Sequence, residues 1–153
     1  MTAKASKVIA ALQGRTLATA ESCTGGIIGA VLTGVSGASA VYRGGIISYV
    51  NDVKHQLLGV DAQLLQSVGA VSAPVAEAMA AGARREVGAD IAVSVTGLAG
   101  PGGDDFGNAV GTVFIGYSDP NRTLSRKFLF SGDRETVRRQ AAEAALDMIL
   151  EFV

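Results

Sequence analysis

The sequence Ala-Glu-Ser-Cys-Thr-Gly-Gly at residues 20–26 lies between a strand-like run, Thr16–Thr19, and an apolar helical run, Ile27–Leu32. It predicts a strand-to-helix turn that carries two candidate nucleophiles, Ser22 and Cys23. Its glycines let backbone N–H groups approach a ligand, and the helix start adds unpaired donors and a partial positive charge for an anion or oxyanion. A structural role fits the same residues: a Ser or Thr helix cap beside a buried Cys, with glycines for tight packing.

The length of 153 residues fits a single domain over residues 1–153. A domain of this size buries roughly 68–70% of the surface that its unfolded chain exposes, so it needs no disulfide. The single Cys excludes an internal disulfide, and residues 1–7 lack the apolar core of a signal peptide. Both features predict a cytoplasmic protein. No apolar run approaches the roughly 20 residues of a membrane span.

The charge balance argues against two classes of binding protein. Thirteen basic and fourteen acidic residues give a net charge of -1, whereas a general nucleic-acid binder shows a basic face. Aromatic residues make up only 5% of the chain and Trp is absent, which disfavours a base-stacking surface. These two features predict no nucleic-acid partner, and the short apolar runs predict no membrane partner. We also expect a small-molecule substrate and a homo-oligomer.

Helical and strand patterns alternate along the chain. Helices are expected at residues 4–13, 24–33, 51–58, 62–67, 73–87 and 134–151, and strands at 17–20, 41–50, 90–96, 112–117 and 123–130. The expected helix caps are Thr24, Asn51 or Asp52, Asp61, Ser72 and Asp133. A bulge is expected near Gly44 and Gly45. This order of elements predicts an α/β fold, a three-layer α/β/α sandwich with a mixed sheet.

A second glycine-rich segment, Thr-Gly-Leu-Ala-Gly-Pro-Gly-Gly at residues 96–103, directly follows a strand expected to be buried. Glycines at this density suit a backbone nest for a phosphate or carboxylate. The segment matches neither a P-loop nor the dinucleotide fingerprint. Because ligands bind at the carboxyl ends of strands in open α/β sheets, we expect this loop to meet the Ser22 turn at one edge.

A serine nucleophile needs a neighbour that accepts its proton, and the chain offers two candidates. His55 is the only histidine, although a lone His beside Lys54 at the start of a short helix is usually a solvated surface residue. Lys54 can act as the base if burial or nearby positive charge keeps its amine neutral, and Tyr49 can orient or relay through its hydroxyl. An exposed helix charge is the ordinary alternative for Lys54.

Metal chemistry is not expected. One Cys and one His provide no zinc cluster, and the adjacent carboxylates of Asp104 and Asp105 are typical of a solvated loop. We therefore expect no metal and no cofactor.

Several motifs follow one another along the chain in a fixed order. They are residues 20–26, Gly-Gly…Tyr…Asn-x-x-Lys at 44–54, Gly-Ala-Val-Ser at 69–72, residues 96–103, Val-Gly-Thr-Val at 110–113, Gly-Asp-Arg at 132–134 and Val-Arg-Arg-Gln-Ala at 137–141. Together they resemble the C-terminal domain of the CinA family over almost the whole chain. Stand-alone proteins of this type are nicotinamide-nucleotide amidases, which convert nicotinamide mononucleotide to nicotinate mononucleotide and ammonia in pyridine nucleotide salvage.

The resemblance implies a metal-free site with Ser22 as nucleophile, Lys54 as base and Tyr49 as a supporting hydroxyl. The N–H groups near Thr24–Gly26 are expected to hold the oxyanion. Other residues expected to contact the substrate are Cys23, Thr24, Gly25, Gly26, Thr96, Gly97, Gly100, Gly102, Gly103 and Arg139. Arg134, Arg138 or Arg139 can pair with the 5′-phosphate, with at least two of the three expected in solvent.

Two departures from the family pattern keep an alternative open. Val50 stands where the family often has Ser, and Asn108-Ala109 stands where it often has Lys-Pro. Loss of a loop lysine can weaken phosphate binding. The alternative is a catalytically silent nucleotide-binding module with a regulatory role linked to competence or DNA damage.

Overall fold

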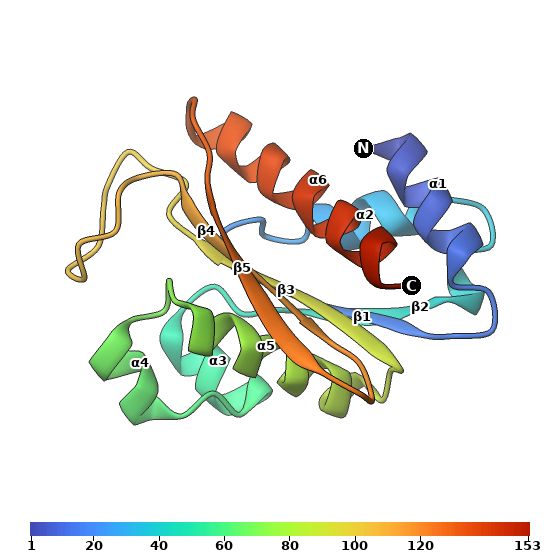
Figure 1. Cartoon of the computed structure of the whole chain (residues 1–153), viewed down its shortest axis with the longest axis horizontal. Helices are drawn as coiled ribbons and strands as arrows, with labels where there is room; N and C mark the ends of the chain where they lie inside the picture. Colours follow the sequence, from blue (N-terminus) through green and yellow to red (C-terminus); the bar gives the residue numbers. More distant parts are fainter.

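The computed structural model describes residues 1–153 as a five-stranded mixed sheet with helices on both faces (Figure 1). The strand order is β2-β1-β3-β4-β5. The strands are β1 (Leu17–Glu21), β2 (Tyr42–Ile47), β3 (Ile91–Gly97), β4 (Thr112–Ser118) and β5 (Thr123–Leu129). Strands β1, β2 and β3 are parallel, β4 runs antiparallel to β3, and β5 runs antiparallel to β4. The three-layer α/β/α sandwich expected from the sequence is confirmed.

The helices form the two outer layers. One layer holds α1 (Thr2–Ala11), α2 (Ile27–Thr33) and α6 (Arg134–Phe152), and the other holds α3 (Asn51–Leu58), α4 (Ala62–Val68) and α5 (Ala73–Val87), as Figure 1 shows. A short 3-10 helix, η1 (Ala38–Ala40), precedes β2. No helix combines the length and the apolar character needed to cross a bilayer.

The two faces of the sheet differ in side-chain size. On β3, Ile91, Val93 and Val95 belong to the larger core under α1, α2 and α6, whereas Ala92 packs in the smaller core under α5. On β4, a Cβ at Gly116 would lie 2.3 Å from the carbonyl oxygen of Ala76, so α5 packs directly on the backbone. Burial on both faces explains why β3 reads as a continuous apolar run rather than an alternating one.

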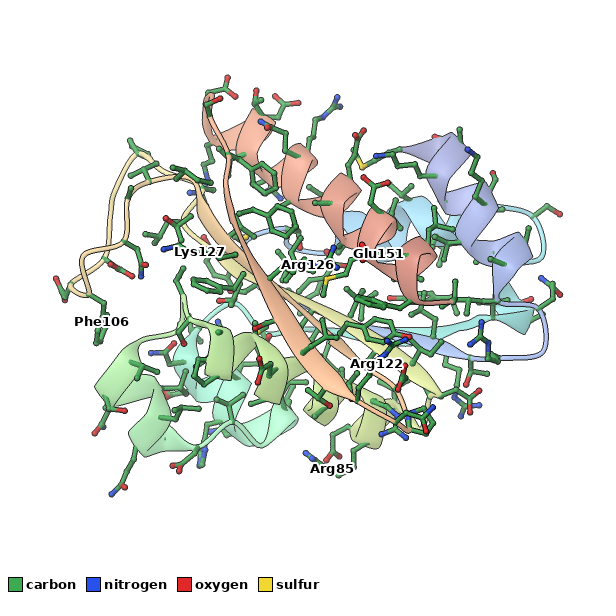
Figure 2. All side chains as sticks on the ribbon, viewed as in Figure 1. Arg85, Phe106, Arg122, Arg126, Lys127 and Glu151 are labelled. Carbon is green, nitrogen blue, oxygen red and sulfur yellow. The ribbon has the colours of Figure 1, made fainter.

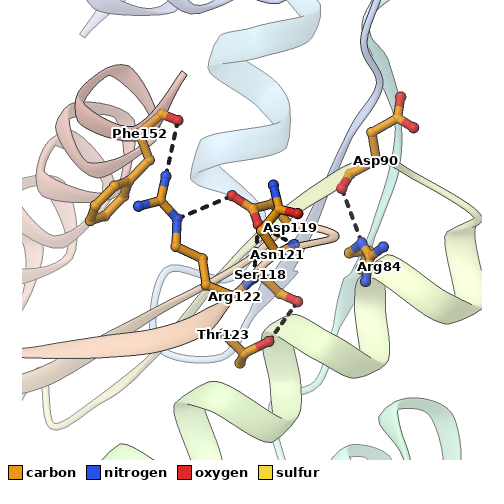
Figure 3. Close-up of polar contacts among 8 residues, drawn as sticks. All are labelled: Arg84, Asp90, Ser118, Asp119, Asn121, Arg122, Thr123 and Phe152. Carbon is orange, nitrogen blue, oxygen red and sulfur yellow. Dashed lines mark hydrogen bonds and ion pairs between the residues drawn. The ribbon is translucent and has the colours of Figure 1, made fainter.

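The β4–β5 hairpin is fastened to the end of α6. Asp119 accepts hydrogen bonds from the N–H groups of Asn121 and Arg122, which closes the predicted turn. The guanidinium of Arg122 pairs with Asp119 and lies 4.5 Å from the centre of the Phe152 ring (Figure 3). Further along β5, Arg126 pairs with Glu151 of α6 (Figure 2). These contacts hold the C-terminal helix against the sheet.

Two of the predicted caps are confirmed. Asp61 accepts a hydrogen bond from the N–H of Gln63, and Asp133 accepts one from Thr136. The bulge is confirmed as well, because Leu17 pairs with Tyr42 but Ala18 pairs with Gly44.

Ser72 is at the predicted N-cap position, whereas the predicted caps at Thr24 and at Asn51 or Asp52 are wrong. Helix α2 begins after Gly26, and the hydroxyl of Thr24 donates to the carboxylate of Glu21 instead of capping the helix. Helix α3 has Val50 at its N-cap and no side-chain cap. Ser72 does occupy the N-cap of α5, but its hydroxyl donates back to the Gly69 carbonyl. At α2, the carboxylate of Glu21, the last residue of β1, accepts the N–H groups that a cap would take.

Candidate active site

A cavity of about 460 Å³ lies at the carboxyl edge of the parallel strands. It is lined by the turn after β1, the segment after β2 and the glycine-rich loop after β3. These three segments meet because β1 pairs in parallel with both β2 and β3, so that the three strands end at the same edge of the sheet. The lining residues are Ser22, Cys23, Tyr49, Asn51, Lys54, Ala70, residues 97–102 and Arg134. The expected meeting of the two glycine-rich segments at one edge is therefore observed.

Ser22 and Lys54 form a buried pair in this cavity. The Nζ of Lys54 donates to Ser22 Oγ at 2.9 Å, and the two residues are only 1% and 7% exposed respectively. Position 54 lies on the first turn of α3, on the helix face that turns inward to the sheet edge. The amine also donates to the carbonyls of Ser48 at 2.7 Å and of Tyr49 at 3.3 Å. The pair thus has the geometry of a nucleophile and its base.

No carboxylate compensates the Lys54 amine. It takes part in no ion pair, and its other acceptors are neutral carbonyls and a hydroxyl. Burial therefore lowers the pKa of Lys54 from 10.5 to about 8. A neutral amine here has two N–H bonds for the carbonyls of Ser48 and Tyr49 and a lone pair for the Ser22 hydroxyl proton. The surroundings accordingly suit a lysine that works as a base near neutral pH.

Cys23 is a less suitable nucleophile than Ser22, because Lys54 Nζ contacts Ser22 Oγ and makes no hydrogen bond to the thiol. The side chain is 5% exposed, and burial raises the pKa of its thiol to about 11, although the positive charges of Lys54 and Arg138 act in the opposite direction. A thiol in this state carries little thiolate at neutral pH. Of the two adjacent candidate nucleophiles, the structure favours Ser22.

Glu21, which the sequence analysis did not assign, organises the turn. Its carboxylate is 2% exposed and accepts hydrogen bonds from the N–H groups of Gly26, Ile28 and Gly29 and from the Thr24 hydroxyl. This side chain occupies the positive end of α2, which the sequence analysis had assigned to an anion. An acidic residue at the end of an otherwise apolar strand, just before a helix, was the available signal.

The N–H groups of the turn are therefore divided into two sets. Gly26 donates to Glu21, and Gly25 donates to the Ser22 carbonyl at 3.0 Å, so neither has a free N–H for substrate. The N–H groups of Cys23 and Thr24 donate to no backbone carbonyl of the chain. Of the expected donors Thr24–Gly26, only Thr24 thus has a free N–H, and Cys23 supplies a second one.

The arginines of α6 have three different environments. Arg134 lines the cavity, where its guanidinium donates to the Gly100 carbonyl at 2.8 Å and to the Tyr49 hydroxyl at 2.9 Å. Arg138 binds the carbonyls of Cys23 and Thr24. Arg139 lies outside the cavity, where it is 65% exposed and paired with Glu135. Position 139 faces away from the sheet, so Arg134 replaces it as the cation at the site.

Tyr49 contributes through two different atoms. Its carbonyl accepts from Lys54, whereas its hydroxyl accepts from Arg134, and the residue is 58% exposed. The hydroxyl has no contact with Ser22 or Lys54. Tyr49 and Arg134 therefore form one wall of the cavity.

The glycine-rich loop forms the part of the cavity lining next to Arg134. Gly97, Gly100 and Gly102 line the cavity, but Thr96 is buried with its hydroxyl on the Ala70 carbonyl, and Gly103 lies outside. Farther along, the amide of Asn108 donates to Asp104 and to the Val71 carbonyl.

The tip of this loop reaches α4. A Cβ at Gly69 would lie 2.6 Å from the ring of Phe106, which marks the outer end of the loop in Figure 2. Contacts with the segment between α4 and α5 thus fix both Phe106 and Asn108.

His55 does not reach the cavity. Its Nδ1 is 2.7 Å from the Val60 carbonyl oxygen, and the ring has no contact with Ser22. No group of three His, Cys, Asp or Glu side chains in residues 1–153 is placed to hold a metal ion. Lys54 is therefore the only base candidate in contact with Ser22.

The fold and the site together define an α/β domain with a buried serine–lysine pair at the carboxyl edge of a mixed sheet. The sequence pattern of the CinA C-terminal domain matches residues 1–153. The chain belongs to the CinA family.

Curated relatives and solved structures agree with this assignment. A CinA-like protein of Mycolicibacterium gilvum is 50% identical over 144 residues, which cover 94% of this chain and 34% of that protein. The chain thus spans about a third of the curated relatives it matches. The crystal structure of a competence-damaged protein (CinA) superfamily member from Klebsiella pneumoniae has a TM-score of 0.95 at 34% identity and covers 98% of this chain and 95% of that one. A competence/damage inducible protein from Agrobacterium tumefaciens has a TM-score of 0.94 at 37% identity, with 98% and 93% covered.

Proposed function

We propose that this domain hydrolyses the carboxamide of nicotinamide mononucleotide to nicotinate mononucleotide and ammonia, as in pyridine nucleotide salvage. The observation that carries the proposal is the contact of 2.9 Å between Lys54 Nζ and Ser22 Oγ, with an amine that no carboxylate neutralises. A serine paired with a lysine of lowered pKa is suited to acyl transfer from an amide.

The chemistry follows from the positions of the groups. Ser22 Oγ attacks the carboxamide carbon while Lys54 takes the hydroxyl proton. The N–H groups of Cys23 and Thr24 hold the oxyanion. Lys54 then returns the proton to the amide nitrogen, the C–N bond breaks, and ammonia leaves an acyl ester on Ser22. Water, deprotonated by Lys54, attacks the ester; the bond to Ser22 Oγ breaks, Lys54 returns the proton to that oxygen, and the carboxylate is released.

The charges around the cavity support an anionic substrate. Its lining residues include two cationic side chains, Lys54 and Arg134, and no carboxylate. Because Lys54 is assigned to the chemistry, Arg134 is the candidate partner of the 5′-phosphate. To meet the phosphate, its guanidinium has to exchange its hydrogen bond to the Tyr49 hydroxyl for one to the ligand.

The two departures from the family pattern lie outside the cavity. Val50 is 54% exposed at the N-cap of α3, and the Asn108 amide holds the loop instead of lining the site. Neither side chain is among those that line the cavity. Their position supports turnover over the silent-module alternative.

The test is ammonia release from nicotinamide mononucleotide by purified protein, with Ser22→Ala as the matched control. We expect steady release by the wild type and none above background by the variant. Arg134→Gln should raise KM by roughly tenfold or more with a smaller effect on kcat, since it removes a phosphate contact. Tight binding of the nucleotide without ammonia would instead favour the silent regulatory module.

A further inference from the structure

The peptide groups of the nucleophile turn are held from two opposite sides. On one side the buried carboxylate of Glu21 accepts the N–H groups at the start of α2. On the other side the guanidinium of Arg138, from α6, donates to the carbonyl of Cys23 at 2.9 Å and to the carbonyl of Thr24 at 3.1 Å. Arg138 is more than a hundred residues away in sequence and reaches no other residue by a hydrogen bond.

The geometry of the peptide bond connects these carbonyls to the oxyanion donors. In a trans peptide the C=O of one residue and the N–H of the next point in opposite directions. A guanidinium that holds the Cys23 carbonyl toward α6 therefore turns the Thr24 N–H away from α6. The Ser22 carbonyl, held by the Gly25 N–H at 3.0 Å, fixes the Cys23 N–H in the same way.

Gly25 provides independent evidence that the conformation of the turn leaves space for the Arg138 guanidinium. Its φ is +61°, and a Cβ at this position would lie 3.2 Å from the Nη2 atom of Arg138. A side chain here would both strain the backbone and press on the guanidinium. The glycine thus leaves room for Arg138 as well as for the turn.

We propose that Arg138 is a positioning residue for the reaction of Ser22, because it orients the peptide groups whose N–H donors at Cys23 and Thr24 stabilise the oxyanion. Its positive charge also faces the same peptide groups and strengthens their field at the oxyanion. The inference rests on the proposed acyl transfer at Ser22, but it does not depend on which amide is the substrate.

The experiment compares Arg138→Ala and Arg138→Lys with Arg139→Ala, a neighbour on the same helix that is exposed and outside the site. With nicotinamide mononucleotide, Arg138→Ala should lower kcat by roughly 10²-fold, the effect of losing an oxyanion donor, while KM changes little. Arg138→Lys should fall in between, because an ammonium lacks the planar fork that holds two carbonyls. Millimolar guanidinium should restore much of the activity of Arg138→Ala, and Arg139→Ala should behave like the wild type.

A second readout separates this inference from the choice of substrate. A fluorophosphonate probe forms a bond between its phosphorus and Ser22 Oγ, loses fluoride and places a P–O oxygen where the oxyanion lies, while the hydroxyl proton passes to Lys54. Labelling of Ser22, followed by mass spectrometry, should slow in Arg138→Ala and recover with guanidinium. If the wild type is labelled but releases no ammonia from the nucleotide, the proposed substrate fails and the inference stands.

Two outcomes overturn the inference itself. One is an equal labelling rate in wild type and Arg138→Ala. The other is a reduced rate that guanidinium does not restore, because the substitution has then damaged the fold instead of the alignment of the donors. Melting temperatures of all three variants identify that damage.

Discussion

Two glycine-rich segments meet at the cavity, and they are held in different ways. The turn at residues 21–26 is fixed by two charged side chains. Glu21 is buried, and Arg138 is partly buried. The loop at residues 98–111 also has charged partners, Asp104 and Arg134, but its contacts are partly exposed: the Asn108 amide donates to Asp104 and to the Val71 carbonyl, and Arg134 donates to the Gly100 carbonyl. A hydrogen bond to a charged group is stronger when it is screened less by water.

The contrast teaches that glycine content alone does not identify the chemical role of a segment. In the turn, glycines accompany fixed backbone donors beside the nucleophile. In the loop, they line the cavity, and the constraint differs between them: a Cβ at Gly100 would lie 2.6 Å from Val110, whereas one at Gly102 would meet no atom within 4 Å. Substitutions in the turn should therefore have larger effects on activity and stability than substitutions in the loop.

The largest effect is expected from the Lys54 amine, which belongs to the turn side of the cavity. Lys54→Arg should lower kcat by about 10³-fold or more, because a guanidinium stays protonated and cannot take the Ser22 proton. His55→Gln is the matched control on the same helix and should retain nearly full activity. The measurement is kcat of the two variants by steady-state kinetics. An inactive His55→Gln together with an active Lys54→Arg would contradict the serine–lysine assignment.

A pH profile sharpens the comparison, because the loop side has no group that must lose a proton. With the pKa of Lys54 lowered to about 8, kcat/KM should rise roughly tenfold per pH unit below 8 and level off above it. The free energy of unfolding should also depend on the titration of Lys54. Between about pH 8 and the ordinary lysine pKa of 10.5, the unfolded chain binds the Lys54 proton and the folded chain does not, so the free energy of unfolding rises with pH there.

Denaturant titrations at several pH values measure this slope. Lys54→Met, which has no titratable group, should lose the contribution of Lys54 to it. An activity profile centred near pH 6.5 would instead point to a histidine.

The glycines themselves give a direct test of the two segments. Gly25→Ala should lower kcat by roughly tenfold or more and cost about 1–2 kcal/mol of stability, since its φ is +61° and the new Cβ meets Arg138. Gly102→Ala in the loop should change either quantity little, because its φ is not in the left-handed region and no atom lies within 4 Å of the new Cβ. Equal losses in both variants would show that the two segments are not held differently.

The smallest effect is expected from the contacts that hold the loop. Asn108→Ala removes hydrogen bonds to Asp104 and to the Val71 carbonyl in a partly exposed place, which should cost about 1 kcal/mol. We expect KM for the nucleotide to rise by no more than about fivefold with kcat nearly unchanged. A large fall in kcat would place Asn108 in the chemistry and remove the distinction between turn and loop.

Local patterns in the sequence determined the fold and part of the site. The alternation of apolar strands with capped helices led to the mixed sheet with helices on both faces. The carboxyl-edge rule then brought Ser22 and the loop after β3 together, because those features depend on short-range periodicity and on general rules of α/β topology. Arg139 could not be separated from its neighbours in this way, since all three arginines lie within two turns of one helix.

What only the tertiary structure decided is how charged groups are paired once they are buried. Glu21 takes the start of α2 instead of Thr24, Arg138 reaches the turn from α6, and Arg134 rather than Arg139 lines the cavity. These outcomes depend on contacts between residues far apart in the chain and on the cost of leaving a buried polar group unpaired. The sequence by itself determined which groups are present, and packing decided which of them meet.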